Sequence, residues 1–232
     1  MSKILRFGLI AFVLTFVFNV AAVTETNAQG ALQEILNRMD EHNKLLKTLQ
    51  ANIKMDKLNA QLGEHDVTEG AIKYLPGASE KNIYVRIDWE KPIVEHLAVA
   101  NGQYVLYTPR RQQAIVGKVD KAQGNAKANG ALGFMGMNKA QLKANYNVKY
   151  IGQENVEGGI PTIHLELTPK NATSYKSADI WIDGNGMPVQ AKVTEKNNDS
   201  TTILLSRLQK NMKISGSDFS LKPPKGTKII NG

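Results

Sequence analysis

The side chains that most often perform chemistry in proteins are scattered through this 232-residue sequence. The four histidines stand at positions 42, 65, 96 and 164, without the close spacing typical of metal ligands. The chain has no cysteine, which excludes a disulfide, a thiolate metal site and a cysteine nucleophile. No serine lies in a G-x-S-x-G setting, and neither H-E-x-x-H nor a phosphate-binding glycine loop occurs. The sequence therefore predicts a protein that is not an enzyme, with no catalytic residue, metal or cofactor.

Two further places have residues that could bind an ion. The stretch Asp183-Gly184-Asn185-Gly186 looks like part of a calcium loop, but it lacks the downstream acidic ligands and lies between two predicted strands. We interpret it as a hairpin turn. Arg110 and Arg111 could hold an anion, although two arginines at the end of a strand are more often simply solvated.

The beginning of the chain has the pattern of a targeting segment. Two basic residues precede an almost unbroken apolar run from Phe7 to Val23, and Ala28 provides a small residue before a cut. We predict that residues 1–28 are a cleaved signal peptide and that residues 29–232 form one exported, soluble domain. The alternative is an uncleaved anchor, but a spanning helix needs about 20 residues. No cysteine follows the run, so the chain is not itself a lipid-anchored lipoprotein.

The chain is basic, with a formal net charge of +8 that falls to +7 once Lys3, Arg6 and Glu25 are removed. A basic surface attracts anionic partners such as lipid headgroups, acidic proteins or nucleic acid. A plain excess of solvated lysines is the simpler explanation. For an exported chain nucleic acid ranks last, and we predict that it is not a partner.

The segment from Asn82 to Gln113 has the clearest strand pattern. In its first strand, apolar residues from Ile83 to Trp89 alternate with more polar ones, so that one face is apolar. Pro92 interrupts the run, and the pair Asn101-Gly102 fits a two-residue hairpin because both residues tolerate positive φ. We expect the middle of an antiparallel meander with one apolar side.

An amphipathic helix is predicted ahead of this meander, over residues 31–49. Leu36 and Met39 belong to its apolar stripe, which requires an apolar surface to pack on. Further strands are predicted on both sides of the meander, which gives about ten to eleven strands. The predicted class is mainly β, in the α+β sense, with a single domain.

The strand pattern is interrupted between Asp120 and Asn145. The apolar residues at its centre are interleaved with glycines: Leu132, Phe134, Met135 and Met137. The segment is either an ordinary loop that packs these residues into the core or a mobile apolar flap that closes over an apolar ligand. Asn138 is predicted to cap a short helix over residues 139–144.

With these elements in place, the chain resembles the LolA family of periplasmic outer-membrane lipoprotein carriers over nearly the whole mature chain. The amphipathic helix and four stretches in order carry the resemblance: IDWEKPIVEHLAVANGQYVLYTP from Ile87, LTPK at 167–170, IWIDGNGMPVQ from Ile180, and FSLKPPKG at 219–226. The resemblance implies an incomplete antiparallel β-barrel, with lid helices over a concave apolar face, in a periplasmic protein that performs no bond chemistry.

The resemblance also implies a function and partners. Such chaperones take acylated lipoproteins from an inner-membrane ABC transporter and carry them to the outer membrane. A carrier of this kind works most simply as a monomer. One position departs from the family pattern, because Leu75 stands before Pro76 where well-studied members have an arginine that ties the lid shut. A leucine cannot make an arginine's hydrogen bonds, so the closed state should be less favoured. The outer-membrane acceptor is therefore left unassigned.

We predict that an apolar cleft binds acyl chains or lipid through residues of the meander and of later strands: Ile87, Trp89, Leu97, Val99, Leu165, Leu167 and Leu205. A movable lid over it is predicted from two segments: Leu36, Met39, Leu132, Phe134, Met135 and Met137. The same residues could instead pack a closed core. An envelope-stress sensor or a general lipid-binding protein could also be built on this fold. A porin-like barrel fits poorly, because the strands are few and polar on their outward face.

Overall fold

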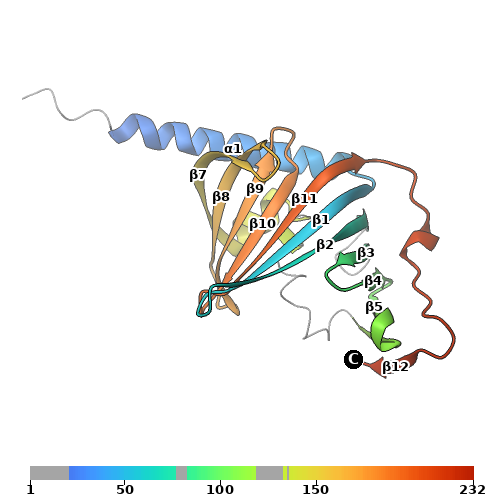
Figure 1. Cartoon of the computed structure of the whole chain (residues 1–232). Helices are drawn as coiled ribbons and strands as arrows, with labels where there is room; N and C mark the ends of the chain where they lie inside the picture. The colour runs from blue at the N-terminus through green and yellow to red at the C-terminus, as the bar shows by residue number, and fades with distance from the viewer. Residues whose placement is uncertain (1–20, 77–82, 119–132, 135) are drawn as a thin grey trace, which may run out of the picture.

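The computed structural model describes residues 21–76, 83–118, 133–134 and 136–232. They form one twelve-stranded sheet, with α1 (Ala21–Leu45) lying across one end of it and α3 (Lys139–Asn145) leading into an edge strand (Figure 1). Two short 3-10 helices are η2 (Pro109–Arg111) and η4 (Gly216–Phe219). The strands are β1 (Leu49–Asn59), β2 (Glu64–Leu75), β3 (Tyr84–Lys91), β4 (Glu95–Ala100), β5 (Gln103–Thr108), β6 (Gln113–Lys118), β7 (Tyr146–Val156), β8 (Ile160–Pro169), β9 (Tyr175–Asp183), β10 (Pro188–Glu195), β11 (Ser200–Lys210) and β12 (Lys228–Asn231).

The sheet is open, and its strand order is β12-β6-β5-β4-β3-β2-β1-β11-β10-β9-β8-β7. All neighbours are antiparallel except β12, which runs parallel to β6. The predicted class, a mainly β incomplete barrel with antiparallel strands, is confirmed. The prediction of ten to eleven strands missed β12, because Ile229 and Ile230 alone provide its apolar signal.

One face of the sheet is apolar almost from edge to edge. Side chains alternate along a strand, so the register fixes which of them share a face. One row of paired residues crosses β8 to β1 and a second crosses β1 to β5: Leu165, Ile180, Ala191, Ile203 and Met55, then Ala51, Ile72, Ile87, Leu97 and Leu106. We call this the inner face and the opposite one the outer face.

Helix α1 differs at both ends from the predicted range of 31–49. It begins at Ala21, ahead of the predicted cleavage site, and ends at Leu45. Leu49 fits the helical spacing, but it starts β1 instead, where it pairs with Tyr74 and Lys210 and is 3% exposed. Burial in the sheet therefore outweighs the helical pattern at this residue.

The short helix α3 begins at its predicted cap. The Asn138 side chain accepts a hydrogen bond from the Gln141 amide (2.9 Å), and the Gln141 side chain accepts one from the Asn138 amide (3.0 Å), which completes a capping box. Just before it, the Phe134 ring packs 5.6 Å from the ring of Tyr146 and 6.4 Å from that of Tyr175. Packed aromatic residues therefore flank α3, with Phe134 before it and Tyr146, the first residue of β7, directly after it.

The β9–β10 turn approaches α1 very closely. Arg38 Nη1 of the helix donates to the Gly184 carbonyl (3.1 Å), and a β-carbon on Gly186 would lie 2.2 Å from the Arg38 carbonyl oxygen. Gly186 also has φ of +84°, which disfavours other residues. This turn is the predicted hairpin turn. Only glycine at position 186 allows it to pack this closely against α1.

A second close approach occurs within the sheet. The register between β2 and β3 shifts between Glu69 and Gly70, and a β-carbon on Gly70 would lie 2.2 Å from the Asp88 carbonyl oxygen and 2.8 Å from the Trp89 Cα. Such a glycine marks a bulge or a bend in a strand. Here it lies on the inner face, next to Trp89.

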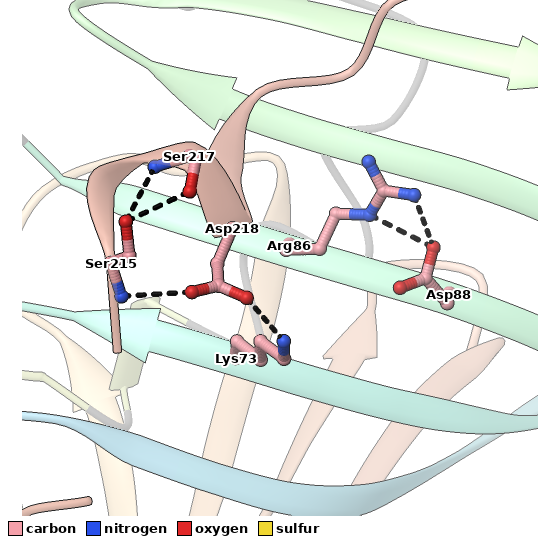
Figure 2. Close-up of polar contacts among 6 residues, drawn as sticks. All are labelled: Lys73, Arg86, Asp88, Ser215, Ser217 and Asp218. Atoms are coloured by element: carbon pink, nitrogen blue, oxygen red, sulfur yellow. Dashed lines mark hydrogen bonds and ion pairs between the residues drawn. The ribbon is translucent and has the colours of Figure 1, made fainter. Parts of the chain in front are cut away.

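The chain after β11 returns to the far edge as a strap, residues 211–227, which places η4 against β3 and β4 (Figure 1). Figure 2 shows an ion pair between β2 and η4, with Lys73 Nζ 2.6 Å from Asp218 Oδ1. Phe219 is 1% exposed, and its ring lies 5.8 Å from that of Tyr84. Lys73 and Tyr84 are outer-face residues by the register, so the strap supports the sheet from outside.

Candidate functional site

The inner face holds all the residues predicted to line a cleft. The register brings them together from β3, β4, β8 and β11: Ile87, Trp89, Leu97, Val99, Leu165, Leu167 and Leu205. These residues are remote in sequence but continuous on one face. Whether they bind a ligand stays a prediction.

Exposure divides the inner face into two parts. In the covered part, formed by β1 to β3 and β7 to β11, Leu165 and Leu167 are 0% exposed and Trp89 is 7% exposed. In the open part, formed by β4 to β6, the inner residues are only half-buried: Leu97, Val99, Leu106 and Ile115. The apolar surface therefore continues beyond the region in which side chains are fully buried.

Helix α1 and the described residues between 133 and 145 form a cover. Of the predicted lid residues, Leu36 and Met39 are 0% exposed, Phe134 is 1% exposed and Met137 packs half-buried against the same cluster. Leu132 and Met135 lie outside the described residues. The four described lid residues thus belong to one apolar core with the covered part, and whether they move stays a prediction.

Polar contacts hold the two pieces of the cover together. Four hydrogen bonds cross between them: Asn43 Nδ2 to the Met137 carbonyl (3.1 Å), the Lys139 amide to Asp40 Oδ1 (2.8 Å), Lys139 Nζ to Asn37 Oδ1 (2.7 Å) and Lys143 Nζ to Gln33 Oε1 (2.9 Å). Each such bond is worth only about 1 kcal/mol net. We call this set the latch, and it can be broken at modest cost.

Leu75, where the family resemblance leads one to expect an arginine, ends β2 and pairs with Tyr84. The neighbouring Tyr74 lies on the inner face, as Ile72 does, and its hydroxyl would lie 3.3 Å from a β-carbon on Gly136. Burial raises the pKa of Tyr74. Tyr74 therefore lies between the end of β2 and the cover, a position that the sequence analysis missed.

His42 lies on the buried side of α1. It is 8% exposed, and its Nε2 is buried without a hydrogen-bond partner among the described residues. Burial and the charge of nearby Lys210 lower the pKa of His42, against the opposing effect of Asp183. The sequence analysis assigned no role to this histidine, although it follows Met39 by about one helical turn, on the apolar stripe.

The outer face carries the polar network around Arg86, which faces away from the apolar side as its place in the alternation predicts. Arg86 donates two hydrogen bonds to Asp88 Oδ1 (2.9 and 2.6 Å), as Figure 2 shows, and His96 Nδ1 lies 2.6 Å from the same oxygen. Burial opposes ionisation of this carboxyl, but the hydrogen bonds outweigh burial and lower the pKa of Asp88. This network lies on the outer face, away from the apolar inner face, and its role is structural.

The other two candidate ion sites have ordinary surroundings. Arg110 and Arg111 are exposed in η2. Asp183 Oδ1 accepts hydrogen bonds from the amides of Asn185 (2.9 Å) and Met187 (2.8 Å), so this carboxylate is engaged in its own turn.

The fold and the inner face define a class of protein: an open antiparallel half-barrel whose apolar face is partly covered by helices. Among the described residues, no helix combines the length and the apolar character needed to span a membrane. The chain belongs to the LolA family, because the family described as "Outer membrane lipoprotein carrier protein LolA" matches residues 80–222, more than half of the sequence. The resemblance noted from the sequence is confirmed.

Solved structures share the fold at low sequence identity. An uncharacterized conserved protein from Thermus thermophilus is 12% identical, with a TM-score of 0.55 over 87% of this chain and 99% of that one. MucB is 14% identical, with a TM-score of 0.53 over 85% of this chain but only 63% of its own. Curated protein sequences contain no match.

Proposed function

We propose that the chain is a periplasmic carrier that binds the acyl chains of lipoproteins, or lipid, on its inner face and moves them from the inner to the outer membrane. The observation that carries this proposal is the open part of the inner face, where Leu97, Val99, Leu106 and Ile115 stay half-buried. Family membership supports the same direction, because the family description names a lipoprotein carrier.

The apolar surface is suited to an acyl chain. Burying one methylene contributes about 0.8 kcal/mol, so a long chain laid along the open part would gain several such increments. A ligand that extended into the covered part would have to displace Phe134 and Met137, which now pack against the core. That displacement would also break the hydrogen bonds of the latch, each of which contributes little free energy.

The latch also bears on the missing arginine. Leu75 cannot donate hydrogen bonds through its side chain, so closure in this chain would depend on the contacts between α1 and residues 137–143 and on Tyr74 beside Gly136. We expect the cover to open more readily than one that an arginine ties shut, which favours release as well as uptake.

The remaining parts of the proposal concern the cell. Residues 1–28 would be removed as a signal peptide, and residues 29–232 would act as a soluble monomer in the periplasm. An inner-membrane lipoprotein-releasing ABC transporter would supply the acylated lipoproteins, and the outer-membrane acceptor stays unassigned. No catalysis and no cofactor are proposed.

Binding is tested with processed protein recovered from the periplasm of a Gram-negative host and purified without detergent. We expect native mass spectrometry to detect bound lipid or lipoprotein, and a fluorescent fatty acid to bind. Val99→Asp places a charge on the open part and should weaken fatty-acid binding at least about tenfold. Val94→Asp makes the same change at a position that is 46% exposed in the β3–β4 turn, and should leave binding intact.

Circular dichroism must show that both variants are folded. A wild-type chain that takes up no fatty acid, or a folded Val99→Asp variant that binds like wild type, would overturn the proposal. The alternative function, an envelope-stress sensor, would then be favoured. Transport is tested separately, with spheroplasts whose own carrier is depleted. A carrier should release labelled lipoprotein into the supernatant, whereas a general lipid-binding protein should not.

A further inference from the structure

Two exposed apolar side chains lie at the corner where α1 ends and β11 ends. Leu45 is 68% exposed and Met212 is 50% exposed. Three exposed lysines belong to the same two segments: Lys44, Lys47 and Lys213. We call these five residues the basic corner, and Figure 1 shows the end of α1 beside the end of β11 and the start of β1.

The backbone of the basic corner is held firmly. Asn211 Nδ2 donates to the Leu45 carbonyl (3.3 Å), and Asn211 Oδ1 accepts from the Lys47 amide (2.7 Å). Thr48 Oγ1 donates to the Met212 carbonyl (2.6 Å), and the Asn211 amide donates to the Thr48 carbonyl (2.8 Å). The two apolar side chains are therefore presented to solvent by a fixed frame rather than by a loose end.

The charge around them is mostly positive. Lys44 pairs with Glu41, but Lys47 and Lys213 make no ion pair with any residue that the structure describes. Exposed apolar side chains by themselves are ordinary on protein surfaces, so the charge is what distinguishes this corner.

The opposite end of the sheet provides the contrast. Leu62 is 66% exposed in the β1–β2 turn, nearly the same value as Leu45. The strand that follows it begins with two exposed acidic residues, Glu64 and Asp66. An exposed leucine occurs at both ends, but the nearest charged residues in sequence on the C-terminal side are acidic after Leu62, whereas Lys44 and Lys47 flank Leu45.

We infer that the basic corner docks on the surface of an anionic phospholipid bilayer. Lysines next to an anionic membrane each strengthen binding about fivefold, and apolar side chains that enter the interface add to this. Two apolar side chains are too few for a stable protein interface, which needs about 1,000 Å² of buried surface. A bilayer has no such threshold, because it accepts single side chains.

The position of the corner gives the docking a purpose, and this step rests on the proposed function. Leu49 starts β1 four residues after Leu45 and pairs with Tyr74, which in turn pairs with Val85 at the start of β3. The corner thus lies at the end of the sheet where α1 ends and the strands leading to the open part begin. Docking there would bring the edge of the acyl-binding surface to the membrane.

The test is co-sedimentation of the processed chain with vesicles of phosphatidylglycerol and phosphatidylethanolamine, against vesicles of phosphatidylcholine alone. We expect binding to the anionic vesicles only, weakened by salt. Leu45→Asp should lower that binding about tenfold, whereas Leu62→Asp, its matched control in exposure and chemistry, should not. The double variant Lys47→Glu/Lys213→Glu should also lose binding, and it tests the corner independently of the apolar change.

Equal binding to both vesicle types, or equal losses from Leu45→Asp and Leu62→Asp, would overturn the inference. So would capture of an acidic protein through the corner with no binding to anionic vesicles. Fatty-acid binding in solution separates this result from the proposed function. Leu45→Asp should bind the fluorescent fatty acid like wild type, whereas failure of the proposed function would appear as absent fatty-acid binding in the unmodified chain.

Discussion

The covered and open parts of the inner face have the same sequence pattern but are supported from opposite sides. In the covered part, α1 and the described residues between 133 and 145 pack against strands that carry fully buried inner residues such as Leu165 and Ile180. In the open part, Leu97 and its neighbours are only half-buried. Alternation along a strand predicts which side is apolar, but elements from elsewhere in the chain decide how completely it is buried.

Support for the open part comes from the outer face. Phe219 of the strap is 1% exposed, and Ala98 of β4, which η4 packs near, is 4% exposed. β12 then adds to the edge of β6. Three strands whose inner residues are only half-buried in the described part of the chain are thus packed from the other side. Under the proposed function, their inner side is the one that would bind a ligand.

The largest expected effect sharpens this comparison with a matched pair of leucines. Leu165→Ala removes a fully buried side chain and should lower the free energy of unfolding by about 3 kcal/mol. Leu97→Ala removes a half-buried one and should cost about 1 kcal/mol. Urea denaturation followed by circular dichroism measures both.

Fatty-acid binding should respond in the opposite order. Leu97→Ala removes a contact of the open part and should weaken binding, whereas the folded fraction of Leu165→Ala should bind nearly as wild type does. Equal losses of stability in the two variants would mean that the open part is packed as fully as the covered part.

The packing of the β9–β10 turn against α1 can be disrupted by adding a single β-carbon. Gly186→Ala places a β-carbon against the Arg38 carbonyl at positive φ and should destabilise the fold by about 2 kcal/mol. Gly184→Ala, in the same turn, meets nothing within 4 Å and serves as the control. Hydrogen exchange should become faster in α1 for Gly186→Ala only, and unchanged exchange there would show that the turn does not position the helix.

A smaller effect is expected from acid, through His42. Since the folded chain holds this side chain at a pKa below its ordinary 6.5, the unfolded chain takes up a proton first as the pH falls through 6.5. The free energy of unfolding should therefore fall in that range and be fully retained above it. His42→Gln should flatten the pH dependence measured by urea denaturation, whereas His65→Gln, an exposed control, should not. An unchanged slope in His42→Gln would assign the acid sensitivity elsewhere.

The smallest effect is expected from the ion pair between the strap and β2. The ion pair of Lys73 and Asp218 is partly exposed, so Asp218→Asn should change stability by no more than the error of a urea titration. Phe219→Ala should cost about 3 kcal/mol, because its ring is buried. If the two variants were equally damaging, the strap would be held by charge rather than by packing.

The features that the sequence predicted are those with local signals. The alternation before Trp89 located β3, the pair Asn101-Gly102 located a hairpin whose two residues do have positive φ, and Asn138 located α3. The seven inner-face residues followed from the same alternation. In each case the signal and the structure it specifies lie within a few residues of each other.

The features that the sequence did not predict depend on remote contacts. The parallel pairing of β12 is fixed by β6, far earlier in the chain, and the four residues of β12 carry little pattern of their own. The sequence analysis did not predict that α1 begins at Ala21, because it assigned residues 1–28 to a cleaved signal peptide and the helix extends across the predicted cleavage site. The burial of His42 depends on the sheet beneath α1, and the support that the strap gives to β3 and β4 depends on packing that no spacing encodes.

Gly70 has a consequence for the shape of the whole surface. Because it lacks a β-carbon, β2 and β3 approach each other beside Trp89 more closely than any side chain would permit. Bulges and glycine kinks bend the strands that contain them. The curvature of the sheet, and with it the girth of whatever molecule it can wrap, is thus set in part by a residue that has no side chain to offer that molecule.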